Sequence, residues 1–581
     1  MLTNYLRKYF VLLLFVAAGI VCSFGATIDL TRTEFFVKEN GTGSGTDWTD
    51  AMSAIDFAAT LPKAKEGTTF YVAAGTYKPI YTFEGDVAKS NMEKSFGIKS
   101  SVTIKGGYSK NANSPDAICN PRRHLTLFTA DIDGDDIIEL SENSISRTNF
   151  ENNANNLFHL HAENKTLTLS GITVSNANTC GLLSDLNGNS LILSDCKFQN
   201  NKEGFRSIDD RNIDITNSTF QQNDFPIDCG SAGFYGNNCN VDLKQTVFSS
   251  NQSDLVFRCG PLVFDEIEYT YNKGEIWLDC DGDLSIKNST FEHNECNNLV
   301  LLMNTKENKH DMLIENSSFK QNDVSRLLFH ECENSNLKIR NCIISNNTVY
   351  DVLGTQGNSG RGKIFIESSS FTNNTADYIL ESNFITTLTN NTIAENNIKK
   401  SVIFASSTLT MENNTILDRT GNGILQSIAM VEARGNIILP SNSSKRAIVL
   451  AQDYFELENN IITNGTYQSG IVIDDADYEG NIHLTDEKSI NEALAALFEG
   501  KITSTGFEPK ISLNKDNFPT LNLVSDVLSD GVTSIRYPLS TTSQTTDQFG
   551  ATRSSLTCMG SLELCADDID VEWTPETYNI T

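Results

Sequence analysis

The residues of this sequence best suited to chemistry are aspartates at alternate positions in two short loops. Residues 131–136 read DIDGDD and residues 279–283 read DCDGD. Carboxylate oxygens are the ligands that Ca²⁺ prefers, although glycine stands at the fourth position here and not at the sixth, as in an EF-hand. The sequence therefore predicts a Ca²⁺ site at Asp131, Asp133 and Asp135, with an ordinary Asp/Gly turn as the alternative.

Two further sets combine carboxylates with cations, as enzymes that cleave acidic polysaccharides do. Asp209 and Asp210 form one set with Arg361 and Lys363, but roughly six repeats separate the two pairs, or about 30 Å at the spacing of stacked strands. The acidic stretch 474–477 approaches Arg446 only if the loop between them folds back. The seven histidines are scattered. We therefore expect no catalytic constellation.

The charge balance limits the partners. The chain of 581 residues has 44 Lys and Arg against 74 Asp and Glu, a net charge of −30. Nucleic-acid binding needs clustered cations, and anionic lipid attracts basic segments, so both partners are excluded. A protein carrying this charge is expected to stay soluble and monomeric.

The elements that position these residues follow from a repeat in which an aromatic residue precedes asparagine by three positions. Successive copies lie about 21 to 28 residues apart. The pattern begins at Phe150, Phe198, Phe220, Phe248, Phe291, Phe319 and Phe371, with Tyr269 in a longer gap and isoleucine at Ile344, Ile393, Ile416, Ile438 and Ile462. We expect the aromatic residues to stack inside the molecule, because each gains about 1.5–3 kcal/mol by burial, and the asparagines to form left-handed turns with amides paired along the stack.

Within each repeat, apolar and polar residues alternate, as in residues 284–288 and 337–341. This period of two is typical of strands, and strands this short bury an apolar face only by stacking. Leucine-rich repeats have a similar length, but their LxxLxLxxN frame is absent. The sequence predicts an all-β fold, a right-handed parallel β-helix solenoid of roughly 17 coils with a short N-terminal capping helix at residues 48–59.

The ends of the chain differ from the repeats. A basic start at Arg7 and Lys8 followed by an apolar run predicts a secretory signal, and no later run is long enough to span a bilayer. We predict a signal peptide at 1–25, an N-terminal cap at 26–65, the β-helix at 66–490, a C-terminal cap or anchor-like segment at 491–565 and a tail at 566–581.

Twelve of the thirteen cysteines follow the signal peptide. Export permits disulfides, but the irregular spacing, with no CxxC pair, indicates neither a disulfide framework nor zinc. Cys558 and Cys565 are close enough in sequence to form a local bridge. We expect Cys229, Cys259 and Cys332 to be buried thiols.

Several of these motifs resemble known families. Residues 41–48, 71–77 and 104–108 are similar to exported right-handed β-helix proteins of bacterial surfaces, and the FxxN repeats resemble those of polymorphic outer-membrane proteins. Asp547, Gln548, Gly550 and Arg553, with 560–563, resemble the choice-of-anchor Q ending. The resemblance implies a surface location and specifies no activity.

These observations predict an exported, non-catalytic protein at the cell surface or outside the cell. Its expected role is adhesion to a host or matrix surface, or binding of a polysaccharide. The alternative is a lyase or hydrolase acting on acidic polysaccharide, which would show carboxylates with an Arg or Lys from adjacent coils.

Overall fold

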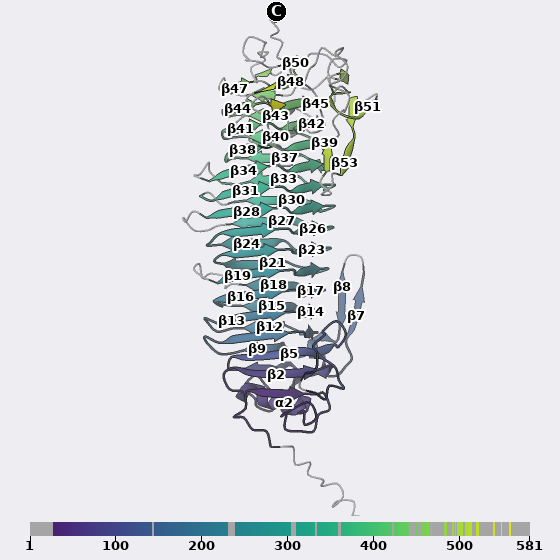
Figure 1. Ribbon diagram of the computed structural model, residues 1–581, viewed down its shortest axis with the longest axis vertical. Coiled ribbons are helices and arrows are strands. Elements are labelled where there is room, and N and C mark those ends of the chain that lie inside the picture. The colour runs from purple at the N-terminus through teal and green to yellow at the C-terminus, as the bar shows by residue number, and fades with distance from the viewer. Residues whose placement is uncertain are drawn as a thin grey trace, which may run out of the picture.

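The computed structural model is a long rod of stacked coils, with a short helix near one end (Figure 1). The structure describes residues 27–558, except 115, 142–143, 230–238, 304–309, 332–333, 358–361, 421–422, 441–447, 451–454, 459, 464–465, 468–481, 485–490, 493, 496, 504–505, 514–518, 522–538, 541–545, 547 and 549–556. The predicted signal peptide and tail lie outside these residues. Three parallel sheets run along the rod, as the prediction requires.

The first sheet has sixteen strands, close to the roughly 17 coils expected. Its strands are β1 Glu34–Val37, β2 Thr68–Ala73, β5 Val102–Tyr108, β10 Thr166–Ser170, β13 Ser190–Ser194, β16 Asn212–Thr216, β19 Asn240–Lys244, β22 Leu262–Asp265, β25 Leu284–Lys287, β28 Asp311–Glu315, β31 Asn336–Arg340, β34 Lys363–Glu367, β38 Ile385–Thr389, β41 Leu409–Glu412, β44 Val431–Arg434 and β47 Phe455–Glu458. The sheet therefore starts with β1, inside the segment expected to be the cap.

The second sheet consists of short strands paired in parallel from one coil to the next. Its strands are β3 Gly75–Tyr77, β6 Thr126–Thr129, β11 Thr173–Ser175, β14 Lys197–Gln199, β17 Thr219–Gln221, β20 Val247–Ser249, β23 Glu268–Thr270, β26 Thr290–Glu292, β29 Ser318–Lys320, β32 Ile343–Ser345, β35 Ser370–Thr372, β36 Thr375–Ala376, β39 Thr392–Ile398, β42 Thr415–Thr420, β45 Ile437–Pro440, β48 Ile461–Thr463 and β50 Ile482–Leu484.

The third sheet has fifteen strands. Its strands are β4 Phe96–Ile98, β9 Asn156–Leu160, β12 Cys180–Ser184, β15 Glu203–Ser207, β18 Phe225–Cys229, β21 Leu255–Cys259, β24 Ile276–Cys280, β27 Glu295–Met303, β30 Asp323–His330, β33 Asp351–Thr355, β37 Tyr378–Ser382, β40 Ser401–Ala405, β43 Gly423–Ser427, β46 Ile448–Leu450 and β49 Thr466–Tyr467.

The remaining elements lie outside the three sheets. They are α2 Ala54–Thr60, the 3₁₀ turns η1 Leu61–Lys63, η2 Asn91–Glu93 and η3 Phe150–Asn152, and the antiparallel strands β7 Ile137–Leu140, β8 Ile145–Thr148, β51 Gly500–Thr503, β52 Gly506–Pro509, β53 Ile511–Leu513, β54 Pro519–Leu521, β55 Leu539–Ser540 and β56 Thr557–Cys558. Among the described residues, no helix has the length and apolar character needed to cross a membrane.

The predicted aromatic stack is confirmed inside the second sheet. Phe198 and Phe220 stack with centroids 4.9 Å apart, and Phe291 and Phe319 with centroids 4.6 Å apart, all fully buried. Tyr269 fills the longer gap, as predicted. Phe150 does not belong to the stack: it lies in η3, and Val174 pairs with Phe198 in its place. The sequence match at Phe150 was therefore wrong.

A column of buried asparagines follows the aromatic stack at the next corner. Its members are at most 1% exposed: Asn201, Asn223, Asn251, Asn272, Asn294, Asn322, Asn347, Asn374 and Asn396. In Asn294, Nδ2 donates to the Tyr269 carbonyl at 2.9 Å and to Asn322 Oδ1 at 2.9 Å, while Oδ1 accepts from the backbone and side-chain amides of Asn272. The amide pairing along the stack is confirmed.

The left-handed turn belongs to a different residue from the one predicted. The residue before each column asparagine has the positive φ, as Gln222 and His293 show at 56° each. None of the column asparagines has a positive φ, and their side chains are buried. The expectation that the same asparagine makes the turn was therefore wrong.

The capping helix is shorter than predicted. The sequence indicated residues 48–59, but α2 begins at Ala54, because the Ser53 side chain accepts a hydrogen bond from the Asp56 amide and caps it there. Asp47 and Asp50 instead hold a turn, accepting hydrogen bonds from Thr49 and Ser44. Competition from these side chains keeps residues 48–53 out of the helix.

The C-terminal segment packs on the outer face of the second sheet near the end of the rod (Figure 1). Leu497, Phe498 and Leu521 pack there against Leu417 and Leu439, which project outward. This packing covers an apolar surface on the side of the rod, and the capping role of the segment stays a prediction.

The described cysteines are unpaired thiols, and Cys229 and Cys259 are buried as expected. Cys259 and Cys280 have sulfurs 3.8 Å apart, stacked on adjacent coils. Cys332, Cys565 and the Cys558 side chain lie outside the described residues.

Candidate functional site

The strongest chemical site lies on the outer face of the third sheet, midway along the rod. Two rows of side chains run along the axis there. One row pairs Arg326, Asp351 and Tyr378 across β30, β33 and β37, and the neighbouring row pairs Phe329, Gly354, Glu381 and Phe404. The inward row beside them, Leu328, Leu353 and Leu380, belongs to the core. The two rows are three residues apart on each strand, so strict alternation does not explain their shared face; Arg326, Tyr378 and Glu381 are partly exposed there, whereas Phe329 and Asp351 are buried.

Asp351 and Glu381 form a pair of carboxyl groups on adjacent strands. Asp351 is fully buried, and neither of its side-chain oxygens accepts a hydrogen bond from a described residue. Burial, reinforced by the nearby charge of Glu381, raises the pKa of Asp351 to about 7. A carboxyl with this pKa holds its proton about half of the time at neutral pH, which is the condition for proton transfer.

A cation and a glycine shape the surroundings of Asp351. Arg326 Nε lies 3.6 Å from Asp351 Oδ2, and the guanidinium stacks over the Phe329 ring at 4.1 Å. A Cβ at Gly354 would stand 3.1 Å from Asp351 Oδ2 and 3.4 Å from the Phe329 ring. Glycine at 354 therefore keeps room for the carboxyl between its two neighbours.

Lysine and tyrosine side chains extend this surface along the next coils. Lys400 Nζ donates to Tyr350 Oη at 2.7 Å, lies 3.1 Å from Asp377 Oδ2, and sits 4.6 and 4.9 Å from the rings of Tyr350 and Tyr378. The hydrogen bond to Tyr350 is the main cause that raises the pKa of Lys400, so the ammonium is charged at neutral pH. The Tyr378 ring is 6.0 Å from that of Phe404.

This arrangement can bind and polarise a sugar polymer. Aromatic faces stack on apolar faces of sugar rings, Arg326 and Lys400 can hold acidic or hydroxyl oxygens, and the Asp351–Glu381 pair can exchange a proton. We name these residues, Arg326, Phe329, Tyr350, Asp351, Asp377, Tyr378, Glu381, Lys400 and Phe404, the mid-rod site. Carboxyl groups and cations from adjacent coils therefore do lie together here, while the expectation that they form no catalytic constellation stays a prediction.

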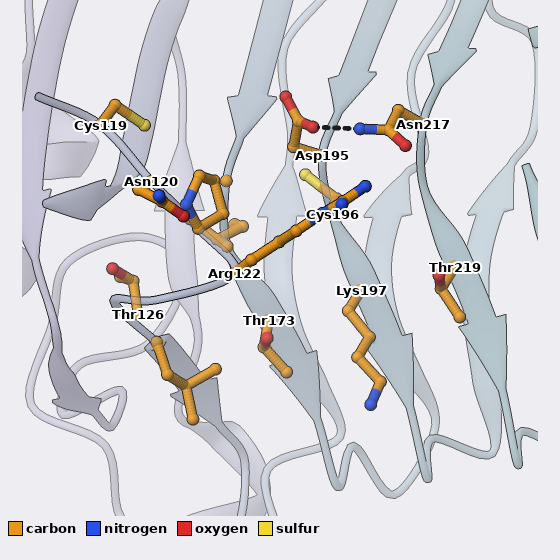
Figure 2. Close-up of a pocket in the computed structure, with 14 residues that line it drawn as sticks. Cys119, Asn120, Arg122, Thr126, Thr173, Asp195, Cys196, Lys197, Asn217 and Thr219 are labelled. Atoms are coloured by element: carbon orange, nitrogen blue, oxygen red, sulfur yellow. Dashed lines mark hydrogen bonds between the residues drawn. The ribbon is translucent and has the colours of Figure 1, made fainter. Parts of the chain in front are cut away.

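A second feature is a hollow of about 540 Å³ on the second sheet near the N-terminal end (Figure 2). Arg122, Lys197, Thr173 and Thr219 line it, and burial lowers the pKa of Lys197. Neither the Arg122 nor the Lys197 side chain has a polar partner among the described residues. The hollow therefore offers two free cations but no acid paired with a base.

The loop predicted to bind Ca²⁺ brings together only part of the predicted set. Carboxylate oxygens of Asp131 and Asp135 lie within 4.8 Å of one another and of Asp136. Asp133 instead accepts a hydrogen bond from Asn91 Nδ2 at 2.8 Å. Ca²⁺ binding at Asp131, Asp133 and Asp135 stays a prediction, with Asp136 as the nearer third ligand.

The other candidate sets remain apart. Asp210 is a buried structural carboxyl that accepts hydrogen bonds from Ser184 and Ser207 at 2.7 Å each, and burial raises its pKa to about 6. Lys363 begins β34, six strands away from β16 in the first sheet. Arg361, Arg446 and residues 474–477 lie outside the described residues.

The sequence analysis missed the mid-rod site because its members are isolated in the sequence. Each member lies one coil from the next, about 25 residues along the chain. The available signal was therefore the recurrence of polar or aromatic residues at that spacing. It also treated the histidines as scattered, whereas His159 and His161 lie together with Asp185.

Comparison with known proteins agrees with this architecture. A family model described as right handed beta helix region matches residues 186–359, 274–438 and 334–514. Among solved structures, the chain is similar to pectate lyase Pel9A, with 13% identity, 93% of this chain and 97% of that chain covered, and a TM-score of 0.23. It is also similar to XylC in complex with xylose, with 10% identity, 91% and 98% covered, and a TM-score of 0.30.

A rhamnogalacturonan lyase matches with 12% identity, 85% of this chain and 98% of that chain covered, and a TM-score of 0.20. No curated protein matches the sequence. The family model spans more than half of the residues, so the chain belongs to the right-handed β-helix family.

Proposed function

We propose that this protein binds a polysaccharide along the outer face of the third sheet, at the mid-rod site. The observation that carries the proposal is the Tyr350–Lys400–Tyr378 group, where two tyrosine rings with centroids 6.3 Å apart flank a charged ammonium. Tyr350 is 43% exposed, so its ring is open to a ligand. Stacked strands repeat at about 4.8 Å, comparable to one sugar ring, so an extended glycan can follow the axis.

The test is a calorimetric measurement of binding. The mature chain, residues 26–581, is titrated with an acidic polyuronide and with a neutral glucan. Tyr350→Ala and Tyr378→Ala should each weaken binding about fivefold to tenfold, the effect of losing roughly 1 kcal/mol of stacking. Tyr271→Ala is the matched control, because this tyrosine is 60% exposed but stacks on His293 away from the site. Absence of binding to any polysaccharide would overturn the proposal.

Cleavage of the bound polysaccharide is a second candidate, favoured specifically by the Asp351–Glu381 pair. A carboxyl with a pKa of about 7 suits general acid or base catalysis, and Arg326 can stabilise developing negative charge. New reducing ends, or absorbance from unsaturated products, would show this activity. Glu381→Gln should abolish it while leaving binding intact, whereas retention of glycan by the parent chain without new chain ends would leave the binding function alone.

We also propose that the protein is exported and acts at the cell surface or outside the cell, as residues 1–25 and the resemblance to surface β-helix proteins predict. The anchor-like ending is proposed to cap the rod. Gln548 attaches this ending to the side of the rod: it is buried, accepts a hydrogen bond from Thr392 Oγ1 at 2.6 Å and donates to the Ser369 carbonyl at 3.2 Å. Fractionation of cells expressing the full chain tests the location.

A further inference from the structure

We propose that His159, His161 and Asp185 form a binding site for a divalent transition-metal cation, with Zn²⁺ as the preferred ion. His159 belongs to β9, His161 follows it on the same outward face, and Asp185 comes directly after β12 on the next coil. His159 Nε2 lies 2.8 Å from Asp185 Oδ2, and His161 Nδ1 lies 3.0 Å from Asp185 Oδ1. The site is separate from the mid-rod site.

The spacing of the three ligand atoms fits a tetrahedral ion. Zinc binds imidazole nitrogen at about 2.0–2.1 Å and carboxylate oxygen at about 2.0–2.2 Å, which places neighbouring tetrahedral ligands about 3.3 Å apart. Asp185 Oδ2 lies 2.8 Å from His159 Nε2 and 3.1 Å from His161 Nδ1, both shorter by a few tenths of an ångström, and the three ligand atoms lie within 4.8 Å of one another. An ion could therefore replace the hydrogen bonds with little movement of the strands.

The loop that crosses the first coils fixes both imidazoles in place. The Phe83 ring lies 4.5 Å from that of His159 and 5.0 Å from that of His161. This loop can pack closely against β4 because residue 97 is glycine. A Cβ at Gly97 would stand 2.0 Å from the Phe83 carbonyl oxygen. Gly97 pairs with His159 across β4 and β9, so the aromatic cover is built directly against the ligands.

Exposure and charge both suit a site with an open coordination position. The side chain of His159 is 9% exposed, but those of His161 and Asp185 are 36% and 21% exposed, so solvent reaches one side. Three protein ligands with one open position are typical of catalytic zinc sites. Asp185 supplies one negative charge, and Glu84 lies near enough to both histidines to interact electrostatically with them.

Two other groups of the described residues offer fewer suitable ligands. Asp131, Asp135 and Asp136 provide only oxygen, which suits Ca²⁺ or Mg²⁺ better than Zn²⁺. His310 has a single carboxylate partner, Asp281, with Nε2 and Oδ1 3.4 Å apart. His310 therefore provides a matched histidine–aspartate pair that lacks the second imidazole.

The experiment is titration of the chelator-treated full chain with Co²⁺ and Zn²⁺. Co²⁺ should produce the intense visible absorption of tetrahedral coordination, and Zn²⁺ should displace it at one ion per chain. His161→Gln and Asp185→Asn should each weaken Zn²⁺ binding by at least tenfold, while His310→Gln should leave it unchanged. Circular dichroism of each variant shows whether the β-helix is retained.

Three results would overturn the inference. The first is absence of tetrahedral Co²⁺ absorption in the parent chain, which would leave the group as a hydrogen-bonded His–Asp–His cluster. The second is equal Zn²⁺ affinity in the parent chain and a folded Asp185→Asn variant. The third is loss of binding in Asp135→Asn but not in His161→Gln, which would assign the ion to the acidic loop.

Discussion

The asparagine column is buried, and in some of the same coils Asp351 is buried beside the partly exposed Glu381, yet these two polar groups have opposite chemistry. Each interior column asparagine donates two side-chain hydrogen bonds and accepts two, as Asn294 and Asn322 show. Asp351 accepts none from a described residue, and burial beside Glu381 raises its pKa. The amides satisfy one another at every pH, whereas Asp351 and Glu381 can share a hydrogen bond only while one of them holds a proton.

The difference distinguishes polar groups that stabilise the fold from the carboxyl pair to which we assign a proposed function. A neutral amide can both donate and accept, so identical residues on successive coils satisfy one another. Two carboxylates can only accept when ionised, so a buried pair must retain a proton or recruit a cation. Buried polar groups without partners are costly, and such groups are typical of functional sites.

Breaking the asparagine column should have the largest effect. Asn294→Ala removes the donors to the Tyr269 carbonyl and the acceptor for both amides of Asn272. Each buried group left without a partner costs about 1–3 kcal/mol, so the free energy of unfolding should fall by about 3–6 kcal/mol. Denaturant unfolding measures the change.

The control for that variant is Asn288→Gly in the same coil. Asn288 is exposed and has a φ of 50°, which glycine also adopts, so the expected change is within about 0.5 kcal/mol. Similar losses in the two variants would contradict a special role for the column.

Asp351→Asn should have the next largest effect. It should raise the free energy of unfolding at neutral pH, whereas Asn294→Ala lowers it. The native pKa of Asp351, about 7, lies above its value of 3.8 in the unfolded chain. Its contribution to stability is therefore complete below pH 3.8 and is lost as the pH rises through 7. Between pH 3.8 and about 7, the free energy of unfolding of the parent chain should fall by about 2–4 kcal/mol. The same quantity should not show this fall in Asp351→Asn.

Thermal or denaturant unfolding from acid to mildly basic pH checks this expectation. Asp214→Asn is the control, because Asp214 is an exposed carboxylate on the first sheet. The prediction fails if Asp351→Asn keeps the pH dependence of the parent chain.

Most of the architecture could be predicted because its signals are local and repeated. The alternation of apolar residues and the FxxN spacing occur in every coil, so errors in one copy, such as Phe150, leave the pattern intact. Tyr269 could be assigned because both neighbouring copies fix its register. The start of α2 could not be predicted in the same way, since it depends on one capping hydrogen bond at Ser53.

The proposed mid-rod site depends on the register between coils, which cannot be read directly from the sequence. Arg326, Asp351 and Tyr378 become neighbours only when coils of unequal length are aligned. Adjacent acids such as Asp209 and Asp210 attracted attention, yet they lie in the turn between β15 and β16, where Asp210 is bound by Ser184 and Ser207. In this fold, candidate functional residues should be looked for at outward strand positions on adjacent coils, not at adjacent positions in the sequence.

The smallest predicted effect concerns the carboxyl that takes the place of asparagine in the column. Asp418 is buried and accepts from the Asn396 backbone amide at 2.7 Å and from Asn396 Nδ2 at 2.9 Å. Burial raises its pKa, so this group also stabilises the fold less as the pH rises. Asp418→Asn should raise the free energy of unfolding by about 1 kcal/mol at neutral pH, roughly one hydrogen bond, and by less in acid.

The reverse change, Asn396→Asp, sharpens the comparison, because it places a second carboxyl against Asp418 inside the column. It should destabilise the protein, increasingly so as the pH rises. Together the two substitutions show whether the change in the free energy of unfolding depends on the type of side chain, amide or carboxyl, or on its position in the column. If Asp418→Asn instead destabilised the protein at neutral pH, the carboxyl would have a partner that an amide cannot replace, and the column would not be the uniform amide stack inferred from its other members.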